Sequence, residues 1–222
     1  MGEEAPVVGV LALQGDVLEH EAALREVGLR TRRVRRPADL EGVDGLAIPG
    51  GESTTLSMLL ESSGLFGPVA DEIARGLPVL GTCAGLILLA AKVEDGRPDQ
   101  RSFGALACTV RRNGYGSQRF SFETEVEPVA GAFGADDGPL PAVFIRAPLV
   151  TEVSDEVEVL ATERSGTHVA PVVLRHGRVL GATFHPELTS DRRVHGLFAR
   201  MVRVACGDGR AGAPGERVAA RR

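Results

Sequence analysis

The chain has 222 residues, of which 43% are hydrophobic and 25% charged, so one domain with a packed core, with or without a tail, fits best. The net charge of -5 argues against nucleic acid as the main partner, because phosphate binding needs a basic surface. Three cysteines do not make a disulfide framework, and the odd number is typical of reduced thiols. The acidic start, MGEEAP, lacks the basic and apolar regions of a signal peptide. No apolar stretch approaches the roughly 20 residues that span a bilayer. These features predict a soluble cytoplasmic protein with no membrane partner.

Strands and helices alternate through the first half. The apolar run at 7–13 is typical of a strand buried on both faces of a parallel sheet, and helical spacing follows. Ser53, Thr54 and Thr55 offer N-cap hydroxyls to a later helix. The pattern predicts strands at 7–13, 30–34, 46–48 and 78–80, and helices at 17–27, 53–62 and 67–75.

Five arginines between positions 30 and 36 form a basic cluster over the second of these strands. We interpret the cluster as a solvated edge strand guarded by charge. Binding of a phosphorylated ligand or an acidic partner is the alternative.

The second half reads as short strands at 107–111, 142–146, 157–161, 171–174 and 178–184, with a hairpin turn at 175–177. Residues 189–191 are expected to cap a final helix that runs to about 204. We therefore predict one domain over 1–206 and a disordered tail over 207–222.

This order of elements predicts an α/β fold, a doubly wound and mostly parallel sheet with helices on both faces. In such folds the active site forms at the carboxyl ends of the strands. The loops at 49–51 (PGG) and 81–83 (GTC) both follow strands, so we expect them to face one crevice.

Cys83 is the candidate nucleophile. It lies between a strand and an apolar helix at 86–91, within GTCAG, where small residues permit a strained turn that exposes the side chain. The start of the helix favours a thiolate and offers amides to an oxyanion. The alternative is a small buried hydrophobe, which is our interpretation of Cys108 and Cys206.

His185 is the candidate base. It ends a strand and is followed by Pro186 and Glu187, and side chains two positions apart in an extended segment point to the same side. Glu187 can therefore hold the far nitrogen of the imidazole. A simple capping role is the alternative, and His20, His176 and His195 are interpreted as packed or solvated.

Five motifs together resemble the class I glutamine amidotransferases, over about 7–204. They are LQG at 13–15, PGGESTT at 49–55, GTCAG at 81–85, FIRAP at 144–148 and FHPEL at 184–188. The second and fourth are specific, and through them the chain is similar to the glutaminase subunits of pyridoxal 5'-phosphate synthase. The resemblance implies the flavodoxin-like architecture of that family. The chain departs from it at Ser117, where a basic residue is common, and in its long tail.

The resemblance implies roles for matching positions. Cys83 would attack the carboxamide of L-glutamine, His185 would act as base and then acid, and Glu187 would orient it. The backbone amides of Gly51 and Ala84 would form the oxyanion hole. Without the resemblance, Arg112 and Arg146 would read as ordinary surface ion pairs. The implied glutamine-binding residues are Gly51, Glu52, Ser53, Arg112, Ile145 and Arg146.

The resemblance also implies a partner, the synthase subunit of pyridoxal 5'-phosphate synthase, in a hetero-oligomer that channels ammonia. Gln14 is a candidate interface or oxyanion-organising residue, and the peptide near Gly50 and Gly51 is expected to be misoriented until the partner binds. We expect no cofactor and no metal ion. Alternatives are the glutaminase of another biosynthetic complex, a γ-glutamyl hydrolase or cysteine peptidase on a related fold, and a non-catalytic interaction protein.

Overall fold

The computed structural model describes residues 4–97, 99–114, 121–134, 138–165 and 167–211. Its main sheet has the strand order β2-β1-β3-β4-β12-β11-β10-β7-β8. The first five strands in that order are parallel, and the remaining pairings are antiparallel. The parallel strands are β1 (Val7–Leu11), β2 (Arg30–Val34), β3 (Gly45–Ile48), β4 (Val79–Thr82) and β12 (Val179–Ala182). The antiparallel strands are β7 (Ser121–Pro128), β8 (Leu140–Ile145), β10 (Glu158–Ser165) and β11 (His168–His176).

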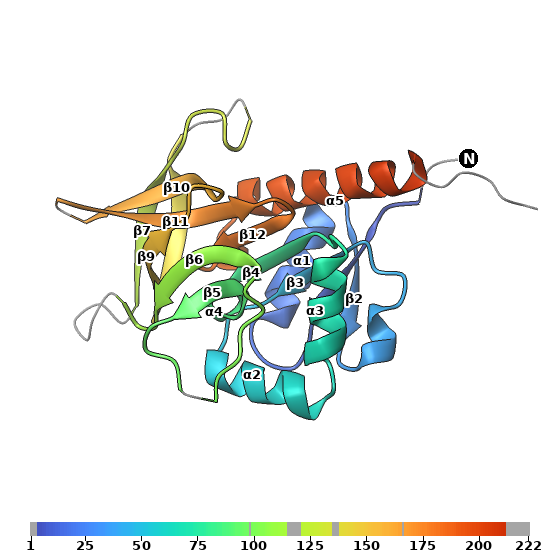
Figure 1. The fold of residues 1–222 in the computed structure, drawn as a ribbon. Helices are drawn as coiled ribbons and strands as arrows, with labels where there is room; N and C mark the ends of the chain where they lie inside the picture. The colour runs from blue at the N-terminus through green and yellow to red at the C-terminus, as the bar shows by residue number, and fades with distance from the viewer. Residues whose placement is uncertain (1–3, 98, 115–120, 135–137, 166, 212–222) are drawn as a thin grey trace, which may run out of the picture.

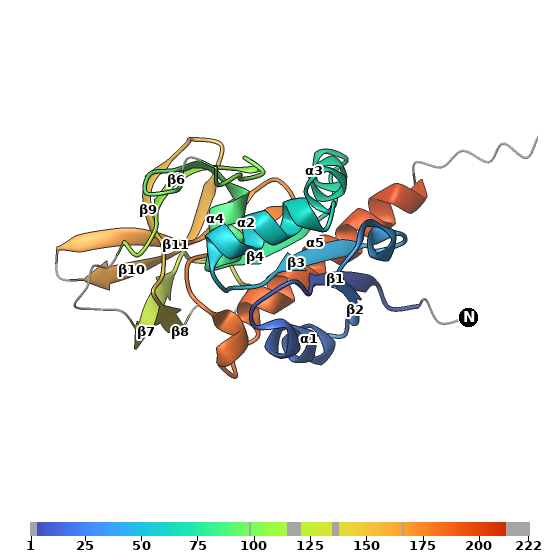
Figure 2. The ribbon, with the colours of Figure 1, turned by 90° about the horizontal axis from the view of Figure 1, so that it is seen from below.

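Helices cover both faces of the parallel strands (Figures 1 and 2). Apolar residues of α1 (Val17–Glu26) and α5 (Arg193–Ala211) share one core cluster. Residues of α2 (Ser53–Ser62), α3 (Phe66–Ala74) and α4 (Ala84–Leu89) share a second cluster on the other face. None of the helices within the described residues is long and apolar enough to cross a membrane. Parallel strands covered by helices on both faces confirm the predicted doubly wound fold.

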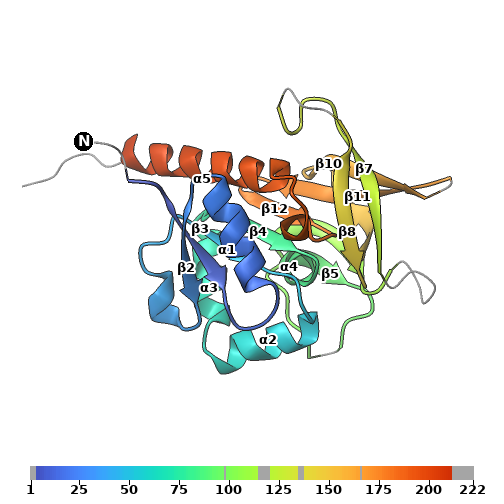
Figure 3. The same ribbon diagram turned by 180° about the vertical axis from the view of Figure 1, so that it is seen from behind.

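Antiparallel strands gather at the end of the molecule away from the N-terminus (Figures 1 and 3). A second sheet of three strands, β5-β6-β9, lies in this part. The sequence prediction missed β5, β7 and β9. Strands β5 and β9 have no clear alternation of buried and exposed residues, whereas β7 has one and could have been found. Their bounds are β5 (Ala90–Val93), β6 (Leu106–Arg111) and β9 (Leu149–Val153), and two 3-10 helices are η1 (Pro37–Leu40) and η2 (Pro186–Leu188).

Three predicted element ends are corrected. The helix expected at 86–91 is α4, which ends at Leu89 because Ala90 pairs with Leu106 in β5 and β6. The N-cap of α2 is Glu52, whose carboxylate accepts the backbone N–H groups of Thr54 and Thr55, in place of the predicted hydroxyls. Helix α5 continues to Ala211, beyond the predicted tail boundary. The rest of that tail, and Ser117, lie outside the described residues.

The arginines of β2 take part in polar contacts along the sheet edge. Arg33 donates two hydrogen bonds of 2.9 Å to the carboxylate of Glu21 on α1. Arg30 pairs with Glu4, and just after the strand Arg36, at the start of η1, pairs with Asp39 at 3.2 Å. These contacts support the interpretation of a charged edge strand.

The pair of Arg33 and Glu21 gives a stability prediction. We expect Arg33→Met to lower the free energy of unfolding at pH 7 measurably, because the Glu21 carboxylate loses its bidentate partner. The Arg33 hydrogen bond lowers the pKa of Glu21 below its ordinary value of 4.5. A lowered folded-state pKa stabilises the fold above the unfolded-state pKa, and the effect is lost as the pH falls through the folded-state value.

Urea unfolding of both proteins at pH 7 and below pH 4 checks this. The difference should shrink at the lower pH. Arg32→Met is the matched control on the same strand, because Arg32 donates to the backbone oxygen of Glu41 and, among the described residues, to no carboxylate. Equal losses for the two variants would contradict the prediction.

Candidate active site

Cys83 lies on a strained turn between β4 and α4. Its backbone has φ 49° and ψ -105°, a conformation that non-glycine residues rarely adopt. Its N–H donates to the carbonyl oxygen of Ala182 at 2.8 Å, which ties the turn to the carboxyl end of β12. The predicted nucleophile elbow is present, and it directs the thiol toward the crevice side of the sheet.

Two glycines make this turn sterically feasible. A Cβ atom on Gly85 would lie 2.0 Å from the carbonyl oxygen of Ile48, and one on Gly81 would lie 2.5 Å from Leu89 Cδ1. The start of α4 therefore packs directly on the end of β3, and only glycine permits this approach. The motif GTCAG reflects close backbone packing as well as chemistry.

His185 and Glu187 form a buried pair behind the thiol. His185 follows β12, and its Nδ1 lies 2.7 Å from Glu187 Oε1. Asp16, in the loop after β1, places Oδ2 at 3.2 Å from the same nitrogen. These three groups also lie as close together as metal ligands would. The short contacts indicate that the N–H at Nδ1 of His185 donates to these carboxylates. This hydrogen bonding occupies the nitrogen and explains why the three side chains lie together.

The charges of this pair follow from its surroundings. Burial lowers the pKa of His185, but hydrogen bonds to Asp16, Cys83 and Glu187 outweigh burial and raise it. Burial raises the pKa of Glu187, but the hydrogen bond and the positive charge of His185 outweigh burial and lower it. The resting site therefore holds an imidazolium against a carboxylate, and an imidazolium stabilises a neighbouring thiolate by ion pairing.

The loop at 50–52 packs between the imidazole and the end of β1. A Cβ atom on Gly50 would lie 2.3 Å from His185 Cε1, and one on Gly15 would lie 1.7 Å from the Gly50 carbonyl oxygen. Gly51 has φ 155°, a backbone conformation that residues with a side chain rarely adopt, and the Glu52 N–H donates to Gln14 Oε1 at 3.1 Å. Gln14 thus holds the peptide that follows Gly51.

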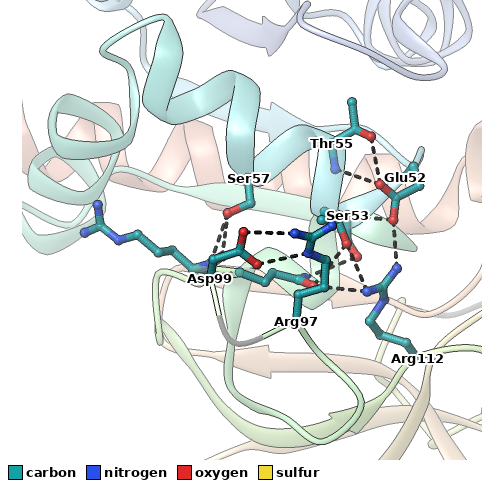
Figure 4. Close-up of polar contacts among 10 residues, drawn as sticks. Glu52, Ser53, Thr55, Ser57, Arg97, Asp99 and Arg112 are labelled. Atoms are coloured by element: carbon teal, nitrogen blue, oxygen red, sulfur yellow. Dashed lines mark hydrogen bonds and ion pairs between the residues drawn. The ribbon is translucent and has the colours of Figure 1, made fainter.

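A polar network joins this loop to Arg112 (Figure 4). Arg112 donates to Glu52 Oε1 at 2.7 Å and to Thr54 Oγ1 at 2.9 Å. Glu52 also accepts N–H groups of α2, as described above. Partial burial raises the pKa of Glu52, but the hydrogen bonds from Thr55 and Thr54 outweigh it and lower the pKa. The side chain of Ser53 receives a hydrogen bond of 3.2 Å from Gln100. Glu52 and Arg112 are therefore held in place without a ligand.

A cavity of about 370 Å³ collects most of the predicted site residues. Arg146 and Asn113 at its rim have φ of 44° and 49°, a strained backbone typical of functional loops. Ala84 and Glu187 do not line it, because Ala84 begins α4 and Glu187 lies behind His185. The lining residues are Gln14, Gly15, Asp16, Gly51, Glu52, Ser53, Cys83, Ile87, Arg112, Asn113, Ile145, Arg146 and His185.

Sequence reasoning missed Asp16 and Ile87. Asp16 carried a usable signal, since it lies just past the first strand, at the sheet edge where the site was expected. Ile87 carried no such signal, because it looks like any apolar residue of α4.

The two cysteines of the core differ in their surroundings. Cys108 is buried in β6, and burial raises the pKa of its thiol to about 12, which supports its interpretation as a structural residue. The sulfur of Cys83 lies 3.8 Å from the carbonyl oxygen of Ile145 and faces the cavity.

A thiol on a strained elbow, with a histidine held by a buried carboxylate, defines a hydrolase-type site with a cysteine nucleophile on a doubly wound α/β sheet. The family model of the SNO glutamine amidotransferase family matches residues 10–204. The chain belongs to this family, and it is an enzyme of the glutamine amidotransferase type.

Relatives and solved structures agree. "Pyridoxal 5'-phosphate synthase subunit PdxT" of Salinispora arenicola (strain CNS-205) is 54% identical over 202 residues, which cover 90% of this chain and 98% of that protein. The protein of the same name from Mycobacteroides abscessus is 53% identical over 200 residues, covering 90% and 99%. A structure titled "Crystal structure of glutamine amidotransferase" has a TM-score of 0.78 and 42% identity, covering 88% of this chain and 98% of that one.

Proposed function

We propose that the chain hydrolyses L-glutamine to glutamate and ammonia, and that the ammonia passes to a synthase subunit that makes pyridoxal 5'-phosphate. The observation that carries this proposal is the convergence of Cys83, His185 and Glu187 at one cavity in a chain of this family. The names of the relatives support the particular product.

The mechanism is acyl transfer through a thioester. The Cys83 thiolate attacks the carboxamide carbon, and the backbone amides of Gly51 and Ala84 receive the oxyanion. His185 donates its proton to the leaving nitrogen, the C–N bond breaks and ammonia departs. His185 then takes a proton from water, whose oxygen attacks the thioester. Glutamate leaves and the thiol is restored.

The rim of the cavity supplies the contacts to the rest of glutamine. Arg112 and Arg146 offer guanidinium groups to its α-carboxylate, and Arg112 retains N–H donors beyond those that bind Glu52. Glu52 and Ser53 follow Gly51 and complete the polar wall of the cavity, and Ile145 supplies an apolar wall. No cofactor or metal ion is required by this chemistry.

The ammonia has to be consumed directly, because in neutral water most of it would be protonated and no longer nucleophilic. The relatives are named as one subunit of pyridoxal 5'-phosphate synthase, so we assign the synthase reaction to a partner chain. Gln14, which holds the Glu52 N–H at 3.1 Å, is the link through which docking would set the oxyanion peptide. The three free cysteines fit a reducing cytoplasm.

Pairing assays test the proposal. The purified chain, mixed with the synthase subunit of pyridoxal 5'-phosphate synthase, should form pyridoxal 5'-phosphate with glutamine as the nitrogen source, and glutaminase activity should rise at least about tenfold on mixing. Activation by the synthase subunit of another biosynthetic pathway would overturn the choice of partner. Cleavage of peptides or γ-glutamyl conjugates without any partner would overturn the assignment as a glutaminase subunit.

A further inference from the structure

Two buried histidines lie behind the catalytic carboxylate and have no part in the mechanism above. His20 on α1 and His195 on α5 are fully buried, and neither lines the active-site cavity. Their rings are 5.4 Å apart, with His195 Nε2 at 3.4 Å from His20 Nδ1. His20 Nε2 lies 3.3 Å from Glu187 Oε2 and 2.9 Å from Thr82 Oγ1. The two rings thus form a chain that ends on Glu187.

Glu187 needs a donor on this side. Its Oε1 binds His185, whereas its buried Oε2 has no hydrogen bond among the described residues. A buried carboxylate oxygen without a donor costs free energy and leaves the group less firmly oriented. His20 Nε2, at 3.3 Å, reaches hydrogen-bond distance after a small rotation of either side chain.

The protonation of the two rings supports donation toward Glu187. Burial lowers the pKa of His20 and of His195, so both are neutral at pH 7 and each carries one N–H. With that N–H on Nε2 of each ring, His195 donates to His20. The Nε2–H of His20 then lies between Thr82 Oγ1 at 2.9 Å and Glu187 Oε2 at 3.3 Å, so the two acceptors share it. The nitrogen left over is His195 Nδ1, which has no hydrogen-bond partner among the described residues and would then be only a lone pair. The opposite tautomers would bury an unpaired N–H there and set a lone pair of His20 against a carboxylate.

The start of α1 contacts both members of the pair formed by His185 and Glu187. Asp16 precedes the helix and contacts Nδ1 of His185, and His20 lies four residues later and contacts Glu187. Positions four apart share one face of a helix, so a single helical turn meets both members of the pair.

We propose that His20 is a positioning residue of the glutaminase reaction: its Nε2–H holds Oε2 of Glu187, so that Oε1 stays aligned with Nδ1 of His185. His195 fixes the tautomer of His20 from behind. Mutation of a group that holds a catalytic residue in this way commonly lowers activity about 10- to 100-fold. The inference rests on the proposed function for its kinetic readout.

Two amide variants separate positioning from packing. The amide nitrogen of His20→Gln reaches the place of Nε2 and can still donate to Glu187, whereas that of His20→Asn reaches only the place of Nδ1. With glutamine and saturating synthase subunit, His20→Gln should keep kcat within about threefold, and His20→Asn should lose about 10- to 100-fold with KM changed less than about threefold.

A second readout does not depend on glutamine hydrolysis. The His185 Nδ1 proton, held by Glu187 at 2.7 Å, should give a far-downfield proton NMR signal, identified by its loss in His185→Gln. The signal should persist in His20→Gln and shift or broaden in His20→Asn. Equal kcat losses and unchanged signals in both folded variants would overturn the positioning role. A wild-type chain that never hydrolyses glutamine would overturn the proposed function, while the NMR comparison would still decide the role of His20.

Discussion

Cys83→Ala is expected to abolish glutamine-driven synthesis of pyridoxal 5'-phosphate, with a loss of at least about 10⁴-fold in glutaminase kcat. The reason is covalent: no other thiol lines the cavity within the described residues, so no thioester can form. Synthesis driven by added ammonium salt should stay within about twofold of the wild type, because the substitution leaves the partner's active site intact. Product formation from each nitrogen source, measured on the same complex, checks this.

Cys206→Ala is the matched control. Cys206 is half-buried on α5, away from the cavity, and its substitution should change neither reaction. Equal loss of glutamine-driven and ammonia-driven synthesis in Cys83→Ala would mean that the residue supports assembly and not chemistry. Retained glutaminase activity would remove Cys83 from the mechanism altogether.

The positions of the proposed catalytic groups could be predicted from sequence because Cys83 and His185 each lie at the end of a buried strand. Cys83 follows β4 and His185 follows β12, and these strands are parallel neighbours with Gly81 opposite Gly181. The same hydrophobic patterns that identify the strands therefore place both residues at one edge of the sheet. Glu187 was predicted from the two-residue period of an extended segment. The contact with His185 is present, but Pro186–Leu188 form a 3-10 helix, so the backbone there differs from the predicted one.

The surrounding groups could not be predicted in the same way. His20 reads as one polar residue in a helix, and nothing local indicates that Glu187 would end 3.3 Å from it. The contact depends on how α1 packs against η2, which is a tertiary property. Strand β9 was missed for a similar reason, since it pairs with the distant strand β6 and has little pattern of its own.

These differences separate two kinds of information in the site. Backbone turns and nucleophile are fixed by short motifs, whereas the electrostatic setting of His185 comes from Asp16 and Glu187, which lie on different elements. The glycines link the backbone turns to the electrostatic setting of His185, because they determine how closely the loops approach the imidazole. The tightest of these approaches gives the second large prediction.

Gly50→Ala is expected to lower glutaminase kcat by about 100-fold or more. A methyl group there would lie 2.3 Å from Cε1 of His185, well inside van der Waals contact. The buried ring has to move by about an ångström, and misplacements of that size typically cost about 100-fold. The loss should appear with glutamine and not with ammonia, measured as in the cysteine experiment.

Gly67→Ala provides the matched control for the loss of a glycine. Gly67 lies in the first turn of α3, and apart from its two chain neighbours and the backbone of its own helix no atom lies within 4 Å of the added methyl group. It lies away from the cavity residues, so this variant should be as active as the wild type. The His185 Nδ1 proton signal then separates two explanations for Gly50→Ala: displacement of the ring shifts the signal, whereas damage confined to the oxyanion peptide leaves it unchanged. An active Gly50→Ala with an unshifted signal would show that the ring does not pack on Gly50, and the close approach of loop and imidazole described here would be wrong.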